Sequence, residues 1–496
     1  MQKQFIKNLV LLLSLNLLIK PFWILGIDRS VQNTVGDGTY GIYLSVFSFT
    51  FLFTILLDMG ITNFNNRNIA QNKHLLSKHF TGIASLKILL SAFYGVLIFV
   101  IGLAIGYRGQ HLYLLGWIGV NQVLLSFILY LRSNISGLLL FKTDSFFSVL
   151  DRVLMILICS ILLWSGWLPA PFRIEWFVYA QTLSYLLTML AALFFVIRHS
   201  GSFKLRFHRP FMLMIIRKSL PFALLALLMS FYNRLEPVLL ERMLPEGIGN
   251  VQTGIYGKAF RLLDAGNNIS LLFSVLLLPM FSSMIKQGQS VNQLVKLSFG
   301  IMLSMSLVVA VLAIAYSNNL MSLLYGLREG ESIAVFTFRI DQSATVFRLL
   351  MGSFVAISTT YIFGTLLTAN GSLKTLNIVA SIGVIINVAI NLLLIPGFQA
   401  IGAAWASLGV QITTALIQFL IARKVFNLRF GISFWWRLVV FIILLFAVTF
   451  GSLLLPFDWK LNFIIAAVAS FLLVFLTRMI CIQNLKKLMV SAQELT

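Results

Sequence analysis

Long apolar runs alternate along the chain with short polar segments. Most runs are about 20 residues or longer, the length that an α-helix needs to cross a ~30 Å hydrocarbon core. They show no strand-like alternation of apolar and polar positions, which disfavours a barrel. The pattern predicts an all-α polytopic membrane protein with about fourteen transmembrane helices. The predicted spans are 9–27, 40–60, 80–105, 112–131, 146–164, 176–197, 219–240, 255–281, 297–316, 345–367, 376–395, 401–422, 438–455 and 461–477.

The most basic segment between two runs, residues 199–218, suggests a boundary between two lobes of six spans each. We expect an N-lobe at 1–200 (spans one to six), a C-lobe at 201–425 (spans seven to twelve), and a third part at 426–496 that holds spans thirteen and fourteen and a cytoplasmic tail. A sequence match with a constant offset of 216 positions supports a duplication: Lys20-Pro21 and Gly38-Thr39-Tyr40-Gly41 align with Glu236-Pro237 and Gly254-Ile255-Tyr256-Gly257. The lobes are therefore predicted to be pseudo-symmetric and equally oriented.

Composition supports the membrane class, since 59% of the 496 residues are hydrophobic and only 10% are charged. The net charge of +22 raises the question of a nucleic-acid partner, and the distribution of charge argues against one. Of the 37 Lys and Arg, 24 lie in alternate segments that include both termini, 7 on the opposite side and 6 within spans. The positive-inside rule then places both termini in the cytoplasm. The first run lacks a signal-peptide cleavage site, so we read it as a retained span.

Charged residues within the eighth run are the main candidates for function. Lys258, Arg261, Asp264 and Asn268 follow at spacings of three, three and four, which places them on one stripe of a helix. One interpretation is a polar stripe that faces a central cavity. The alternative is internal ion pairing, for instance of Arg261 with Asp264, that holds helices together. Two cations for one acid favour the cavity, because unpaired charge at membrane depth needs water or substrate.

The seventh run carries a second charged group. Arg234 and Glu236 lie fifteen and seventeen residues past Ser219, which is about 22 to 25 Å from the inner end at 1.5 Å per residue. Pro237 removes a backbone donor and is expected to bend the helix in this outer half. Arg234 either faces the cavity or extends to the outer headgroups. By the repeat, Lys20 is expected at the corresponding depth on the first span.

Two further charges have open interpretations. Asp58, at the end of the second run, is either an interfacial residue or a proton-coupling one. Arg348, near the start of the tenth run, is either a headgroup anchor or a cavity cation. No spacing of His or Cys predicts a metal site, no phosphate-binding loop is evident and no external loop exceeds about 30 residues. We therefore expect no catalytic residues, no metal and no enzyme activity.

Several motifs taken together resemble one transporter family. They are Gly36-Asp37-Gly38-Thr39-Tyr40-Gly41, Leu57-Asp58-Met59-Gly60, Asn233-Arg234-Leu235-Glu236-Pro237, Gly254-Ile255-Tyr256-Gly257-Lys258-Ala259-Phe260-Arg261, Leu324-Tyr325-Gly326, Thr368-Ala369-Asn370-Gly371 and Ile401-Gly402-Ala403-Ala404. In order and spacing the chain resembles the oligosaccharide flippase, or polysaccharide biosynthesis (O-antigen flippase), family of the multidrug/oligosaccharidyl-lipid/polysaccharide (MOP) superfamily.

The resemblance implies a MATE-like fold of two six-helix lobes plus a C-terminal helix pair, in a bacterial cytoplasmic (inner) membrane. It implies alternating access that moves undecaprenyl-pyrophosphate-linked oligosaccharide, such as an O-antigen repeat unit of lipopolysaccharide, to the periplasmic leaflet. The lipid bilayer and a glycan polymerase machinery are the other expected partners. No cofactor is expected, and a proton or sodium ion is the candidate coupling ion. The alternative is a cation-coupled multidrug exporter of the same superfamily.

A pyrophosphate requires cationic contacts, which Arg makes in bidentate form. The expected site therefore divides into two sets by charge. The predicted headgroup and cavity contacts are Arg234, Lys258, Arg261, Lys20 and Arg348. The candidate ion-coupling groups or charge partners are Glu236, Asp264 and Asp58.

Overall fold

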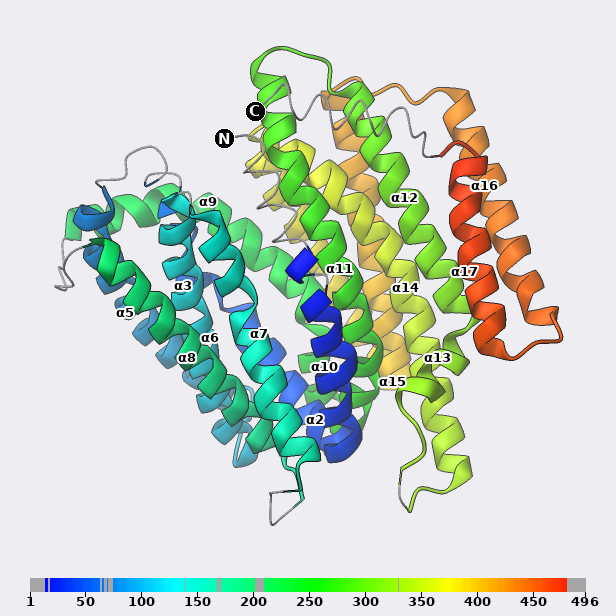
Figure 1. Cartoon of the computed structure of the whole chain (residues 1–496), viewed down its shortest axis with the longest axis horizontal. Coiled ribbons are helices and arrows are strands. Elements are labelled where there is room, and N and C mark those ends of the chain that lie inside the picture. Colours follow the sequence, from blue (N-terminus) through cyan, green and yellow to red (C-terminus); the bar gives the residue numbers. More distant parts are fainter. Residues whose placement is uncertain are drawn as a thin grey trace. The chain divides into compact units, whose positions relative to one another are not determined.

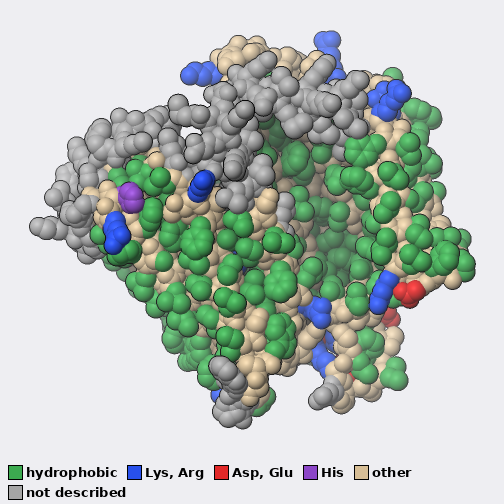
Figure 2. Space-filling view, in the orientation of Figure 1, with side chains coloured by type: hydrophobic (Ala, Val, Ile, Leu, Met, Phe, Trp, Pro, Cys, Tyr) green, Lys and Arg blue, Asp and Glu red, His purple; other side chains and the backbone are tan. Residues whose placement is uncertain are grey.

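A computed structural model describes residues 14–16, 18–62, 65–66, 69, 75–138, 140–166, 171–200, 209–328 and 330–479, and every regular element in these residues is a helix. Cys481, His74, the beginning of the first predicted span and residues 201–208 of the basic segment lie outside this range. The chain forms two compact units, Met1–Gly254 and Ile255–Thr496. Hydrophobic side chains are spread widely over the described part of the face that Figure 2 shows, as expected for helices that contact lipid.

The first unit contains the helices up to the start of α11 (Figure 1). They are η1 (Trp23–Asp28, a π-helix), α2 (Arg29–Leu52), α3 (Ile55–Asp58), α5 (Leu75–Ala104), α6 (Gln110–Gly137), α7 (Phe141–Trp164), α8 (Ile174–Ser200), α9 (Arg209–Arg234) and α10 (Glu236–Met243). Helix α6 packs against α2, α5, α7 and α8, and α10 lies beside α2. The seventh predicted span, α9 with α10, therefore belongs to this compact unit, while the predicted lobe boundary at residue 200 stays a prediction about the repeat.

The second unit begins within α11 (Ile248–Lys286). Its other elements are α12 (Asn292–Ala315), α13 (Ser317–Leu324), α14 (Ile333–Ala369), α15 (Leu373–Val425), α16 (Ile432–Gly451), η2 (Ser452–Leu454) and α17 (Trp459–Leu476). Helix α14 packs on α12, α13 and α15, and the pair α16 and α17 packs on α12. Side-chain caps at Ser332 and Asp458 begin α14 and α17, where each accepts a bond from a backbone N–H of the first turn.

Ten of the described helices are long and apolar enough to span a membrane, or eleven if the bent pair Ala223–Arg234 and Glu236–Met243 counts as one span. Helix α15 contains both the eleventh and the twelfth predicted spans, so these eleven helices account for twelve of the fourteen. The first two predicted spans correspond to the segment that ends in η1 and to α2 with α3, which are not among the eleven.

Among the residues that the structure describes, two helices are each interrupted once. In α2 the backbone leaves the helix at Gly36, with φ 82°, a region that glycine enters without steric cost. In α15 the interruption is at Gln399, with φ 53°. Gly36 separates the first and second predicted spans, and Gln399 separates the eleventh and twelfth. The spans read from hydropathy therefore correspond to real breaks in helical direction.

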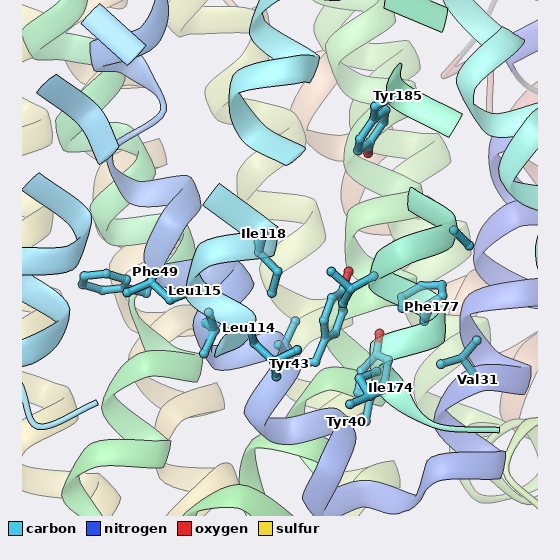
Figure 3. Packing of buried hydrophobic residues seen from close by; sticks show 14 of the residues in the cluster. Val31, Tyr40, Tyr43, Phe49, Leu114, Leu115, Ile118, Ile174, Phe177 and Tyr185 are labelled. Atoms are coloured by element: carbon cyan, nitrogen blue, oxygen red, sulfur yellow. The ribbon is translucent and has the colours of Figure 1, made fainter. Parts of the chain in front are cut away.

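The core of the first unit combines aliphatic and aromatic side chains (Figure 3). Tyr43 of α2 contacts Phe177 of α8, with ring centroids 5.3 Å apart, and Tyr40 lies against Tyr43, with centroids 5.6 Å apart. The Gln181 amide donates to the Tyr43 hydroxyl at 2.9 Å, which satisfies a polar atom inside this apolar cluster. This packing fixes α2 against α6 and α8. On another face of α2, the Ser45 hydroxyl donates to Glu241 of α10 at 3.3 Å.

Candidate functional site

The helix that carries Arg234 and Glu236 is bent between them. Helix α9 ends at Arg234, α10 begins at Glu236, and the two axes differ by 51°. Pro237, which lacks a backbone N–H, occupies the first turn of α10, where that group would have no helical partner. The bend predicted from Pro237 is therefore confirmed. In the first repeat copy, the π-helix Trp23–Asp28 follows Pro21, so both copies interrupt the helix near the proline by different means.

The bend separates the environments of its two charged residues. Arg234 is half-buried and its guanidinium lies 4.6 Å from the centre of the Phe51 ring on α2. Glu236 is buried, with 1% of its surface exposed. A cation–π contact contributes roughly 0.5 to 2 kcal/mol depending on its exposure, which stabilises Arg234 against α2.

The stripe predicted on the eighth span lies on α11. Lys258 is fully buried, its Nζ lies 5.2 Å from the centre of the Tyr325 ring, and the Tyr325 hydroxyl donates to its backbone carbonyl at 3.5 Å. Arg261 and Asp264 are half-buried. The Asn268 amide donates to the Asp264 carbonyl at 2.7 Å. Of the two stripe cations, Arg261 is therefore the more accessible.

Arg348 is exposed on α14 and is bonded to the first turn of α13. Its Nε donates to Ser317 Oγ at 2.6 Å and its Nη2 to Asn318 Oδ1 at 3.0 Å. In the same region the buried Arg339 binds Glu331 in bidentate form, with both N–O distances 2.8 Å. The bonds from Arg339 hold the pKa of Glu331 below its usual range.

Lys20 lies near charged residues of α6 and α7. It is half-buried, and its charged neighbours are Arg152 and Asp151 of α7 and Arg132 of α6. These neighbours lie near the end of α6 and in the first half of α7, the parts predicted to be closest to the cytoplasm. The depth of Lys20 in the membrane stays a prediction.

Asp58 forms an ion pair that the sequence reading did not identify. Its Oδ1 lies 3.1 Å from Nζ of Lys87, which also donates to the Leu57 carbonyl at 2.8 Å. Side-chain exposure is 1% for Lys87 and 28% for Asp58. Thr62 donates its backbone N–H and its hydroxyl to the same carboxylate. In the sequence, the position of Lys87 inside an apolar run is the feature that could have indicated a buried acidic partner.

A second cluster of polar residues, which the sequence did not predict, surrounds Glu241 at the end of α10. Its carboxylate accepts bonds from Nε and Nη2 of Arg242, both at 2.6 Å, and from Ser45 Oγ of α2 at 3.3 Å. Nε2 of His111, at the start of α6, lies 3.0 Å from Oε1 of Glu241. The Arg242 guanidinium lies 4.4 Å from the centre of the Tyr107 ring. Burial raises the pKa of Tyr107, so its phenol remains protonated at neutral pH. We call these five residues the Glu241 network; it connects α10 with α2 and α6.

A family model described as "Polysaccharide biosynthesis protein" matches residues 5–285, more than half of the chain. The chain belongs to the polysaccharide biosynthesis protein family. No curated protein sequence matches it. The family resemblance noted from the sequence motifs is thus confirmed.

Three solved structures show which fold this family member has. The lipid II flippase MurJ in an inward closed conformation has a TM-score of 0.69 at 14% identity, covering 94% of this chain and 98% of that one. An inward-facing multidrug resistance MATE family transporter of the MOP superfamily has 0.59 at 16%, covering 84% and 98%. The Vibrio cholerae MATE transporter VcmN in its bent form has 0.54 at 14%, covering 85% and 97%.

At these identities the likeness shows the fold alone. The protein is an all-helical, multi-pass membrane protein with the fold that MurJ and MATE transporters share, as predicted. The named proteins that share this fold are a flippase and transporters, and the prediction that the protein is not an enzyme agrees with that.

Proposed function

We propose that this protein moves undecaprenyl-pyrophosphate-linked oligosaccharide from the cytoplasmic to the periplasmic leaflet of a bacterial inner membrane, by alternating access and with both termini in the cytoplasm. Membership of the polysaccharide biosynthesis family supports a glycan precursor as cargo. The MurJ-like fold supports a lipid-linked one, because MurJ is named as a flippase of lipid II. The repeat unit of an O-antigen is the cargo class we propose.

The observation that carries the proposal is the cationic face of α11. Arg261 is half-buried one turn from the fully buried Lys258, and Asp264 is the acid of the same stripe. A pyrophosphate carries at least two negative charges and is bound most strongly by preorganised Arg and Lys in a medium of low dielectric constant. We assign the direct contact to Arg261. Lys258, which is buried, contributes positive electrostatic potential without contacting the headgroup.

The remaining cations act at other stages of the passage. Lys20, with Arg152 and Arg132 as neighbours, has the surroundings of a contact near the cytoplasmic side. Arg234 and Arg348 lie in segments predicted to be close to the periplasmic side. A headgroup that crosses the membrane would thus meet cations at successive depths, which lowers the cost of moving its charge.

Three acidic residues are the candidates for coupling transport to a proton or sodium ion. Glu236 is buried beside the bend, and Asp264 is half-buried on the cationic face of α11. Asp58 forms an ion pair with Lys87, which gives it a structural role as well. We propose all three acids as coupling candidates. The glycan polymerase machinery is the proposed recipient of the transported unit.

The test is complementation of surface glycan in a strain from which the gene is deleted. We expect Arg261→Gln to abolish surface glycan and Arg261→Lys to restore part of it, because the charge is kept while the bidentate contact is lost. Lys374→Gln, which removes an exposed cation from α15, is the matched control and should export normally. Membrane levels of each variant are measured by immunoblot. Normal glycan output from Arg261→Gln at normal protein level contradicts the assignment.

The alternative is a cation-coupled multidrug exporter, which the likeness to MATE transporters favours. It predicts dye efflux that depends on a sodium or proton gradient, with surface glycan intact in the deletion strain. The same strain decides between the two functions, since a flippase predicts the reverse result for both measurements.

A further inference from the structure

The turn between α15 and α16 has a defined backbone. Helix α15 ends with Asn427 in the left-handed region, at φ 49°, and the N–H of Leu428 donates to the Arg423 carbonyl at 3.1 Å. This is the long bond of a Schellman motif, and Leu428 is buried, as an apolar residue at that position frequently is. The motif fixes the path of the chain, so the side chains on the turn leave it from fixed positions.

Aromatic rings fix the turn to the rest of the second unit. The centroid of the Phe430 ring lies 5.8 Å from that of Phe299 on α12 and 5.8 Å from that of Phe419 on α15. Phe434 and Trp435, in the first turn of α16, lie 5.3 and 5.9 Å from Phe430. One side of the turn and of the start of α16 is therefore packed against α12 and α15.

Four exposed cations lie on or beside the turn. They are Arg423 and Lys424 in the last turn of α15, Arg429 in the turn itself and Arg437 in the second turn of α16. Within the described part of the chain, none of the four takes part in an ion pair. No acidic residue occurs anywhere between Asp341 and Asp458, so this stretch of chain has no carboxylate that would neutralise the turn.

The end of α17 adds a fifth cation. A Cβ added to Gly300 of α12 would lie 3.3 Å from the Met479 carbonyl oxygen and 3.7 Å from Phe434 Cε2. The end of α17 and the start of α16 therefore meet at the same place on α12, and Figure 1 shows both at one end of the second unit. The exposed Arg478, next to Met479, lies at this end as well.

Large apolar side chains are exposed beside these cations. Ile432 has 86% of its surface exposed and Trp436 has 68%. They are four residues apart on α16 and so share a face of the helix. Helices α15 and α16 are both long and apolar enough to span a membrane, which places the turn between them at a membrane surface. Cations and exposed apolar side chains thus occur together at the level of lipid headgroups.

We propose that the α15–α16 turn, residues 423–437 together with Arg478, binds the headgroup of an anionic phospholipid. The phosphate of such a lipid accepts charge-assisted hydrogen bonds from Arg and Lys, and its acyl chains cover Ile432 and Trp436. A free anion would leave these two apolar side chains uncovered, which favours the lipid as occupant. The site is independent of the proposed function, because it uses none of the residues assigned to the cargo.

The experiment measures which lipid lies at the turn, in vesicles of equal parts phosphatidylcholine and phosphatidylglycerol. A bimane fluorophore is attached at Ser433→Cys, an exposed position, in a chain whose Cys159 and Cys481 are replaced by Ala. Brominated acyl chains, which quench bimane, are carried by one lipid or by the other. We expect a preference for phosphatidylglycerol of about tenfold or more at low salt, which falls as salt is added.

Variants of the cations test which side chains produce the preference. Arg429→Gln and Arg437→Gln should each lower it about fivefold, the contribution of one cation near a membrane surface, and Arg429→Lys should keep it. The two ends of α17 provide a matched pair: Arg478→Gln should lower the preference, and Lys460→Gln should leave it unchanged. Quenching by brominated phosphatidylcholine should be the same in all variants, which shows that each is folded and inserted.

Four results would overturn the proposal. One is equal quenching by the two brominated lipids in the parent, and another is a preference that survives the combined Arg429→Gln and Arg437→Gln changes. An equal preference with bimane at Leu454→Cys, exposed near the opposite end of α16, would show a general attraction to anionic lipid instead of a site. A preference that inorganic phosphate abolishes at constant ionic strength would assign the turn to a soluble anion. Export is not part of the measurement, so the proposed cargo and this site can fail separately.

Discussion

The ion pair of Asp58 and Lys87 makes a sharp prediction, because its two members differ in exposure. Lys87 has 1% of its side chain exposed and Asp58 has 28%, and the charged atoms are 3.1 Å apart. At an effective dielectric constant of 20, two unit charges at that distance attract each other by about 5 kcal/mol. Partial exposure of Asp58 reduces this figure, and we expect Asp58→Asn to cost about 3 kcal/mol of stability, because a buried ammonium group remains.

Removing the lysine of the pair should destabilise the protein much less than removing the aspartate. Lys87→Met leaves a carboxylate that is partly exposed and already bonded to the backbone N–H and hydroxyl of Thr62. We expect this variant to lose only about 1 kcal/mol, because an apolar side chain of similar volume replaces the buried cation. The double variant should resemble Lys87→Met rather than the sum of the two changes.

The assay is a thermal unfolding series of purified protein in detergent, with glycan export measured in parallel. A structural role for Asp58 predicts that the double variant still exports. Equal losses from the two single variants, or a double variant as unstable as Asp58→Asn, would refute the reasoning. A stable double variant that fails to export would instead identify Asp58 as a coupling residue.

Three further predictions concern the outer ends of the helices and the bend. Glu331→Gln should lower the free energy of unfolding by about 1.5 to 3 kcal/mol at neutral pH. In the wild type, the stabilisation by Glu331 should be lost as the pH falls below about 4.3, the pKa of an unfolded Glu, and through the lower pKa of folded Glu331. A melting series from pH 7 to 3 checks this. Glu241→Gln should cost a similar amount, whereas Lys460→Gln, an exposed cation at the start of α17, should change the apparent melting temperature little; an equal effect of both would contradict the Glu241 network. Pro237→Ala should straighten the helix between α9 and α10, reduce export and leave the protein folded, as seen by impaired complementation with unchanged monodispersity.

The repeat noted in the sequence has a structural use that the alignment alone did not indicate. Its Gly38-to-Gly41 copy and its Gly254-to-Gly257 copy meet at the crossing of α2 and α11, through Gly41 of one and Gly254 of the other. The copies differ in their charges, since Ser45 and Ser48 of α2 stand where Arg261 and Asp264 stand on α11.

The sequence by itself determined the helical class, most of the spans, the breaks between them and the bend at Pro237. These features depend on local properties: an apolar run satisfies its own backbone bonds as a helix in lipid, and a proline removes a donor from its own turn. Only the tertiary structure decided which polar groups meet. Lys87 and Asp58 are 29 residues apart, Glu241 is 130 residues from His111, and it is 196 from Ser45. Such contacts depend on how each helix is rotated and tilted against its neighbours, and packing of the whole unit sets that rotation.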